Sequence, residues 1–529
     1  MSLIYSRIFD LSSGLVPESF EADICIVGSG TVGLFLAHLL NKRNANFLLL
    51  DAGPLKPVST ESIGYLPDFS SSVYSGATEG RYFGLGGSSS RWGGALIPHS
   101  SFDLREGDES ESDTTNTWNF ILNSIEENQQ NVLSSFDFSY DPLFCLTSIP
   151  FTECSLHKAL AGSGLSLWQS LILPFSQKNF IRFAEGNTTN SQSTLIYNAS
   201  VSAWQFFPGD SAGLRISSVN AVSLNHKKVQ VKAKRYIICS GAIESARILL
   251  EISAQSNGAY SAEDNEVGRY LSDHLSLPIA RVDPIEVPRV VSLFSPTFQG
   301  SFLRNYRFLL KPESANLPRS FSHFVFRQKD ESFYVAKQIL ASIQSRQLPS
   351  ISAAQTAQSI FGLARLAGNK LINSRLHIPP NTPCDFCIDV EQEKSYTNAV
   401  TLTSKRDKFN RLVANINWGI SLSDKSNINK LSSLYLDAWA RSSTLPNLNT
   451  LPFPTNIAEN SASYDAYHPT ATTRMGNSKL SVVDLNLKVR KFENLWSSST
   501  GVLPSPGTAN PTFSVLCLTA KLANALCPE

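Results

Sequence analysis

The feature that most constrains the fold lies near the N-terminus, where two apolar runs flank a turn with three glycines. Residues 24–27 are apolar and lead into Gly28-Ser29-Gly30-Thr31-Val32-Gly33. A helical segment then reaches Leu40, and a second apolar run over residues 47–50 ends at Asp51 and Ala52. Strand, glycine turn, helix and strand in this order predict a Rossmann-like unit.

Each residue of this pattern has a physical purpose in nucleotide binding. Gly28 permits the sharp turn, Gly30 lets a pyrophosphate approach the backbone, and Gly33 lets the helix pack on the sheet. The helix N-terminus offers free N–H groups to the phosphates, and Asp51 is placed to accept hydrogen bonds from a ribose. The stretch therefore predicts a dinucleotide site and leaves NAD, NADP and FAD open. A glycine turn in some other α/β protein is the disfavoured alternative.

Length and composition exclude several classes of protein. A chain of 529 residues is expected to form two or more domains. A net charge of +1 with 17% charged residues indicates no nucleic-acid partner. No apolar run reaches the roughly eighteen residues of a membrane-spanning helix. Residues 1–20 lack the apolar core of a secretory signal.

Cysteine usage favours a reducing compartment and no metal site. Eight cysteines are sparse for this length, so we expect a reduced, cytoplasmic protein. Cys384 and Cys387 have the spacing of half a zinc site, but no second pair accompanies them. We expect two ordinary thiols there.

A second glycine-rich segment follows, from Gly84 to Gly94. Its permissive backbone suits a loop against which a ligand lies closely. Trp92 and the apolar residues 95–97 disfavour a flexible linker, so the loop is predicted to contact the same cofactor.

The remaining chain mixes strands and helices. Residues 104–190 are expected to form short helices and loops, and a basic segment without acids over residues 334–376 has helical periodicity. Such a segment can lie on a membrane surface, although an ordinary packed helical insertion is preferred. Strands are predicted at residues 195–197, 201–207, 214–222, 229–231, 236–238, 321–326, 386–391 and 399–402, with a helix at 243–252.

Residues 209–213 carry a motif from a different enzyme class. Gly209-Asp210-Ser211-Ala212-Gly213 matches the nucleophile elbow of α/β-hydrolases. That elbow needs a buried strand before the serine and a helix after it, whereas Pro208 precedes and an alternating run follows. A hairpin turn is favoured, and a hydrolase using Ser211 is kept as the weaker alternative.

The C-terminal segment carries a family resemblance. His468-Pro469-Thr470-Ala471-Thr472-Thr473-Arg474-Met475-Gly476 is followed by Gly501-Val502-Leu503-Pro504 and by Asn510-Pro511-Thr512, which opens an apolar helix. This closely resembles the C-terminal signature of the glucose-methanol-choline (GMC) family of FAD-dependent oxidoreductases. Both glycine segments and the blocks at residues 240–245 and 267–274 agree with the family in order, and the match looks most like bacterial sugar-oxidising members.

The resemblance implies an α/β fold with two domains. A discontinuous Rossmann-like FAD-binding domain would comprise residues 1–103, 191–275 and 462–529. An α+β substrate-binding domain with a mostly antiparallel sheet would comprise residues 104–190 and 276–461, with a helical insertion near residues 334–376.

The resemblance also implies residue roles. His468 would take the proton of a substrate hydroxyl, and Asn510 would hydrogen-bond the same oxygen. Arg91 stands where members with covalent FAD often have a histidine, so FAD is predicted to be non-covalent. The implied cofactor contacts are Gly28, Ser29, Gly30, Thr31, Val32, Gly33, Asp51, Ala52, Gly86, Gly87, Ser88, Ser89, Arg91, Trp92, Gly93, Gly94, Val201, Ser240, Gly241, Gly501, Val502, Asn510, Pro511 and Thr512.

The predicted function is oxidation of CH–OH to C=O by proton abstraction and hydride transfer to FAD. A sugar-like secondary alcohol is the expected substrate, and the electron acceptor is open. A flavin-binding scaffold without turnover is the alternative. Peripheral membrane contact is the only membrane interaction that the sequence allows for.

Overall fold

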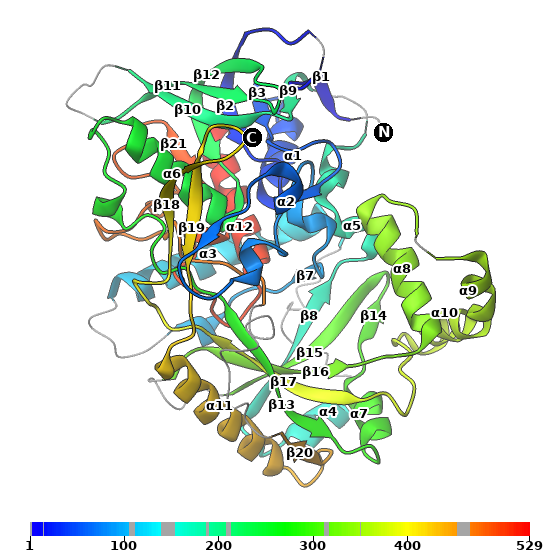
Figure 1. Ribbon diagram of the computed structural model, residues 1–529. Helices are drawn as coiled ribbons and strands as arrows, with labels where there is room; N and C mark the ends of the chain where they lie inside the picture. Colours follow the sequence, from blue (N-terminus) through cyan, green and yellow to red (C-terminus); the bar gives the residue numbers. More distant parts are fainter. Residues whose placement is uncertain are drawn as a thin grey trace.

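The computed structural model describes residues 3–13, 15–104, 112–138, 154–186, 190–207, 213–310, 317–349, 351–451 and 466–528. Two large β-sheets, each with its own helices, occupy opposite halves of the molecule (Figure 1). Ser211 lies outside the described residues.

The first sheet is the one that the N-terminal glycine unit predicts. Its order is β1-β9-β3-β2-β12-β11-β10, and the pairs from β1 to β12 are parallel. The predicted strands at residues 24–27 and 47–50 belong to β2 and β3, and both runs are buried. The strands are β1 (Tyr5–Asp10), β2 (Ser19–Val27), β3 (Phe47–Leu50), β9 (Asn190–Tyr197), β10 (Ser200–Phe206), β11 (Ile216–Val222), β12 (Lys228–Ile238) and β21 (Leu495–Ser497).

Strand β12 joins two runs that were predicted separately. Its first residues pair with β11, its length pairs with β2, and its last three residues pair with β21. Lys232 and Lys234 break the apolar pattern between these runs, so the sequence predicts two strands. In the structure their ammonium groups lie 3.9 and 2.7 Å from carboxylate oxygens of Glu21 and Asp23 on β2. Polar side chains that pair across the sheet therefore continue the strand between its apolar ends.

The glycine turn connects β2 to α1 (Thr31–Lys42) at very short range. Gly28 has a φ of +103°, which favours glycine. A Cβ at Gly33 would stand 1.8 Å from the carbonyl oxygen of Gly28. Only a glycine at position 33 allows the helix to begin this close to the strand.

The second sheet is antiparallel in every described pair, with the order β20-β13-β17-β16-β15-β8-β7 and β14 beside β15. One of its faces builds an aromatic core around Phe308, Phe386 and Trp439. The strands are β7 (Ala95–Leu96), β8 (Leu165–Ile172), β13 (His274–Val282), β14 (Thr297–Gln299), β15 (Phe302–Leu310), β16 (Ser320–Phe326), β17 (Cys384–Glu391) and β20 (Leu448–Thr450).

The remaining described strands form two small sheets. One contains β18 (Ala399–Arg406), β19 (Leu412–Asn417) and β5 (Asp68–Phe69), and the other pairs β4 (Val58–Ser59) with β6 (Tyr82–Phe83). The predicted glycine loop contains a short 3₁₀ helix over Gly87–Ser90.

Helices cover both sheets. Residues 104–190 contain a longer helix than predicted, α3, and also the strand β8. Trp118, Ile121 and Ile125 of α3 pack in the core of the first sheet, together with α12. The helices are α2 (Thr60–Ile63), α3 (Ser112–Ser134), α4 (Cys154–Leu160), α5 (Phe175–Lys178), α6 (Gly241–Gln255), α7 (Val287–Phe294), α11 (Leu422–Ala440) and α12 (Thr512–Leu526).

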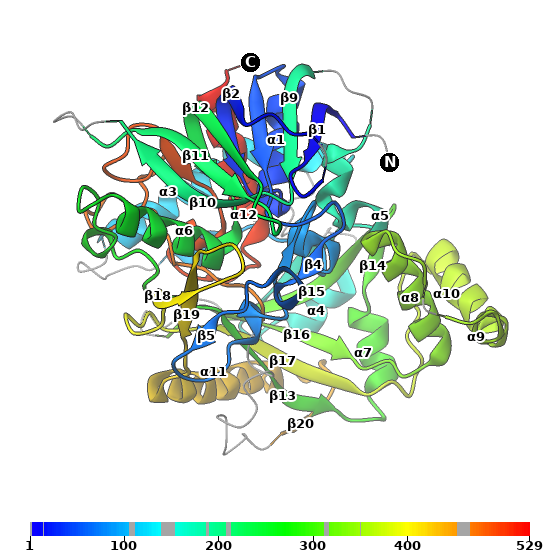
Figure 2. The same cartoon turned by 45° about the horizontal axis from the view of Figure 1, so that its top comes forward.

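The predicted helical insertion forms three helices, α8 (Glu331–Ser345), α9 (Ala353–Gln358) and α10 (Ile360–Asn373). They project from the side of the molecule, with α9 and α10 outermost in both views (Figures 1 and 2). Among the described helices, none is long and apolar enough to cross a membrane.

Candidate active site

A cavity of about 940 Å³ lies where the glycine turn, the second glycine segment and the C-terminal segment meet. This volume is at the upper end for small-molecule sites. Most predicted contacts line it: Gly28, Gly30, Thr31, Val32, Asp51, Ala52, Ser88, Ser89, Arg91, Trp92, Gly93, Gly94, Val201, Ser240, Gly241, Asn510, Pro511 and Thr512, together with His468.

The other predicted contacts lie beneath the cavity wall and shape it. Ser29 and Val502 are fully buried, and Gly501 packs against Thr472 and Thr473. The Gly86 N–H donates to the Ser29 carbonyl oxygen at 2.9 Å. Gly87 (φ +49°) lies so close to Gly30 that a Cβ would stand 2.9 Å from its Cα, and Gly33 packs under the turn. These residues hold the two glycine segments together.

Asp51 contacts the glycine turn itself. Its Oδ2 accepts from the backbone N–H of Ser29 at 2.7 Å and from the Ser29 hydroxyl at 2.6 Å, and its Oδ1 accepts from the Gly53 N–H at 2.7 Å. Burial raises the pKa of Asp51, and these donors oppose that shift. The contact with a ribose stays a prediction, whereas the observed contact fixes the turn.

A buried ion cluster borders the cavity, and the sequence analysis missed it. Glu244 lies 3.0 Å from Arg81 and 2.8 Å from Arg411, both of which line the cavity with it. Arg411 also pairs with Glu251 at 2.5 Å. Burial alone would raise the pKa of Glu244, but Arg247, Arg411 and Arg81 hold it at about 2. The three arginines therefore keep Glu244 ionised at this wall.

The predicted catalytic pair is in direct contact at the cavity wall. The Asn510 Nδ2 lies 2.9 Å from the His468 Nε2. Asn510 immediately precedes Pro511 and α12, so the helix N-terminus also faces the cavity. The chain before it is anchored by Asp103, which accepts from the Thr508 N–H at 2.7 Å and from the Thr508 hydroxyl at 2.8 Å.

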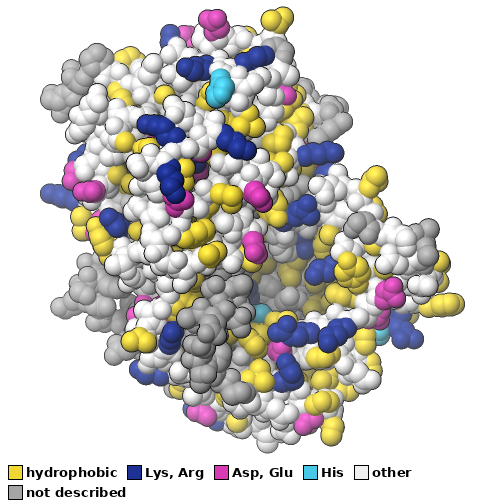
Figure 3. All heavy atoms as spheres, viewed as in Figure 1, with side chains coloured by type: hydrophobic (Ala, Val, Ile, Leu, Met, Phe, Trp, Pro, Cys, Tyr) yellow, Lys and Arg dark blue, Asp and Glu magenta, His cyan; other side chains and the backbone are white. Residues whose placement is uncertain are grey.

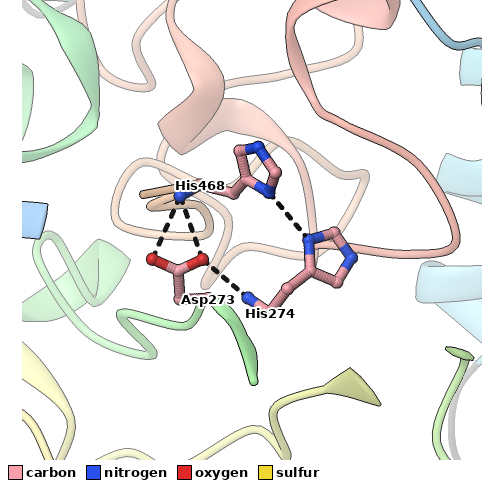
Figure 4. A group of neighbouring side chains, drawn as sticks. All are labelled: Asp273, His274 and His468. Carbon is pink, nitrogen blue, oxygen red and sulfur yellow. Dashed lines mark hydrogen bonds between the residues drawn. The ribbon is translucent and has the colours of Figure 1, made fainter. Parts of the chain in front are cut away.

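Asp273 and His274 position His468, and neither was predicted to have a role (Figure 4). The Asp273 carboxylate accepts from the backbone N–H of His468 at 2.9 Å and from that of His274 at 2.7 Å. Tyr74 donates to the same carboxylate at 2.6 Å. The His274 Nδ1 lies 3.1 Å from the His468 Nδ1. The sequence signal was the block at residues 267–274, which ends in this pair.

The hydrogen-bond partners assign the proton positions of both imidazoles. The His274 Nε2 lies 2.9 Å from the Gly507 carbonyl oxygen, which can only accept, so this nitrogen carries the proton. The His274 Nδ1 of the neutral ring then accepts from the His468 Nδ1. The His468 Nε2 is therefore unprotonated and accepts a hydrogen bond from the Asn510 Nδ2.

Arg307 fixes the orientation of that amide. Its Nη2 donates to the Asn510 Oδ1 at 2.5 Å, which leaves the Nδ2 of Asn510 toward His468. The Arg307 guanidinium also lies 3.9 Å from the centroid of the Phe321 ring. Burial lowers the pKa of Arg307 to about 10, so it remains charged at neutral pH.

Burial, reinforced by His274, lowers the pKa of His468 to about 3. The pKa of His274 is lowered as well, chiefly by burial. Neutral rings agree with the proton positions above. The Nε2 of a neutral His468 can act as a base once the Asn510 amide no longer occupies its lone pair.

Comparison with known proteins supports an oxidoreductase fold. Residues 394–519 match the family model described as GMC oxidoreductase. Pyridoxine 4-oxidase from Mesorbium loti has a TM-score of 0.57 at 16% identity, covering 95% of this chain and 98% of its own. Formate oxidase has a TM-score of 0.57 at 16% identity, covering 97% and 99%.

A variant of Aspergillus oryzae RIB40 formate oxidase, concerned with FAD modification, has a TM-score of 0.56 at 15% identity, covering 97% of this chain and 99% of its own. No curated protein matches the chain by sequence. These structures share the fold at low identity.

The parallel sheet and the cavity at its glycine turn have the arrangement of a dinucleotide-binding α/β protein. The match of residues 394–519 to the GMC oxidoreductase model agrees with the resemblance carried by the ordered sequence blocks. GMC oxidoreductases bind FAD, and the residues present fit that group. The fit rests on the glycine cradle, where a Cβ at Gly30 or Gly93 would meet no atom within 4 Å and would project into open space.

Gly30 and Gly33 allow packing and cofactor binding to be separated. We expect Gly33→Ala to disrupt folding, because its Cβ would clash with the backbone oxygen of Gly28. Gly30→Ala should fold normally, since Gly30 has φ −70° and no close neighbours, but its methyl should weaken FAD binding by about tenfold or more. Circular dichroism melting and FAD titration of the apoprotein measure the two effects. Normal FAD affinity in Gly30→Ala would remove this turn from the FAD site.

The lowered pKa of His468 has a measurable consequence. We expect its imidazole to stay neutral from about pH 8 to pH 5 and to take a proton only near a pH of about 3. Because the unfolded chain binds that proton below about pH 6.5, folding should lose stability as the pH falls. Histidine NMR titration, with His468→Gln to assign the signal, measures the pKa. A midpoint near 6.5 would contradict the buried, neutral ring.

Proposed function

We propose that the protein oxidises an alcohol, CH–OH to C=O, and that a sugar-like secondary alcohol is its substrate. The observation that carries this proposal is the contact between His468 and Asn510 at the cavity wall. Bound FAD supplies the hydride acceptor. The residue roles rest on this geometry and on the family resemblance.

The side chains of this chain account for the proton step. A substrate hydroxyl that enters between the two side chains replaces their mutual hydrogen bond. The His468 Nε2 then accepts the hydroxyl proton, and the Nδ2 of Asn510 donates to the same oxygen as negative charge develops there. His274 and Asp273 keep the His468 ring in place, and Arg307 keeps the Asn510 amide from turning. An alcohol gives up hydride readily only as its proton leaves, so both contacts act on one atom.

Polar groups of the second sheet lie behind this pair, outside the cavity lining. The second sheet presents Arg307 beside Asn510, and the His323 Nε2 lies in hydrogen-bond contact with the Asp389 Oδ2 at 2.7 Å. His323, His274 and Arg307 keep the pKa of Asp389 at about 2 against the effect of burial.

His468 is tested by the rate of flavin reduction. We expect His468→Ala to lower this rate by on the order of 10²-fold or more. His38→Ala is the matched control, because His38 is a largely buried histidine of α1 outside the cavity lining. The substrate is identified by an anaerobic screen of sugars and alcohols for flavin bleaching. Reoxidation of the flavin when air is readmitted distinguishes an oxidase from a dehydrogenase. A flavin that no compound bleaches supports the scaffold alternative, and an unchanged rate removes His468 from the mechanism.

We also propose that the FAD is non-covalent and that the protein works in a reducing, cytoplasmic compartment. The Arg91 guanidinium, which is not a nucleophile, donates to the Oε1 of Gln347 at 3.3 Å. Six cysteines of the described region are free: Cys25, Cys239, Cys384, Cys387, Cys517 and Cys527. Acid precipitation should release the flavin into the supernatant, and yellow colour retained in the washed pellet would contradict a non-covalent cofactor.

A further inference from the structure

The outermost helix of the insertion, α10, presents an apolar face that the rest of the described chain leaves uncovered. Phe361 is 86% exposed, Leu371 82% and Ile372 83%. Phe361, Arg365, Gly368 and Ile372 recur at helical spacing, so they share one side of α10. We call this side, with Leu371, the outer face of α10. No described side chain of α10 counts as buried.

The packing of α10 explains why this face points outward. Gly362 lies against α8 so closely that a Cβ there would stand 2.0 Å from the Ser332 hydroxyl oxygen. The other side of α10 therefore packs on α8. The outer face points away from α8 and from the rest of the molecule. Leu348, in the connection between α8 and α9, is 94% exposed and adds to the apolar surface. Figure 3 shows hydrophobic side chains over these projecting helices, with basic side chains among them.

The insertion is also strongly one-sided in charge. From Ser332 to Cys384 the sequence has no Asp or Glu, and it has five basic residues: Lys337, Arg346, Arg365, Lys370 and Arg375. Within the described residues, only Arg346 of these five has an ion pair, with Glu185 at 2.7 Å. Exposed apolar side chains on a basic helix match an anionic lipid surface, which attracts Lys and Arg while its acyl boundary accepts Phe, Leu and Ile.

A second copy of the chain fits this surface less well. Symmetric pairing would place mostly basic residues against one another, because the acids of this region, Asp330 and Glu331, lie only at the start of α8. A bilayer supplies negative charge and an apolar layer together.

We propose that α8–α10 is a docking element for the surface of an anionic lipid bilayer, with the outer face of α10 and Leu348 entering the headgroup region. A helix of 14 residues is too short to span the bilayer, so the contact is peripheral.

The docking element is tied to the wall of the cavity. The Nε2 of Gln344, near the end of α8, donates to the carbonyl oxygens of Ser89 at 3.1 Å and Trp92 at 3.0 Å. Gln344 is buried, and its own carbonyl oxygen accepts from the Asn179 side chain at 2.9 Å. Docking would therefore place the bilayer beside the part of the molecule that holds the second glycine segment.

Vesicle sedimentation of the FAD-loaded protein tests the proposal. We expect binding to vesicles of phosphatidylcholine with phosphatidylglycerol, and much weaker binding to phosphatidylcholine alone. Combined Phe361→Ser, Leu371→Ser and Ile372→Ser should lower partitioning by about tenfold or more, and Arg365→Gln by about fivefold. Combined Ile285→Ser and Leu422→Ser is the matched control and should change nothing, because both residues are over 80% exposed elsewhere on the surface.

Three outcomes would overturn it. The protein could bind neither type of vesicle, or the triple serine variant could bind as well as the parent. Light scattering could instead show a dimer that the triple variant abolishes, and the outer face would then be a self-association surface. Thermal melting of each variant confirms that it is folded, since all of these side chains are exposed.

Discussion

The contact between His274 and His468 is the interaction on which the site depends, because it joins the two halves of the molecule at the reacting end of the cavity. His274 begins β13 of the second sheet, whereas His468 lies in the segment that returns to the first sheet through β21. Asp273 binds the backbone N–H of both histidines. A shift of about 1 Å between the sheets would redirect the Nε2 lone pair, and displacements of that size can cost a catalytic site on the order of 10²-fold.

Local patterns were enough to predict much of the fold. Apolar runs of strand length, a glycine turn and a helical period predict β2, α1 and β3 without any knowledge of the rest. The same reasoning divided β12 into two strands, because a search for apolar runs does not detect that Lys232 and Lys234 pair with carboxylates on the neighbouring strand. It also underestimated α3, whose mean hydropathy is low because only one side packs in the core.

The parts of the site that were missed depend on contacts between distant positions. Arg307 lies in an ordinary strand of the second sheet, and nothing in its neighbours indicates that it meets Asn510, 203 residues away. The cluster of Arg81, Glu244 and Arg411 has the same character, since its members come from separate elements. Asp51 adds a second function that the local rule did not predict, because its carboxylate binds a neighbouring hydroxyl and two backbone N–H groups of the turn.

The position of Gln344 has a thermodynamic consequence, because this residue belongs to the projecting helices and also contacts the wall of the cavity. Its side-chain amide bridges two carbonyl groups of the second glycine segment. If filling the cavity changes the free energy of that bridge, the affinity of the helices for their surface changes by the same factor, and the reverse holds equally. Under that condition, one buried amide would link the proposed docking of the helices to the occupancy of the cavity.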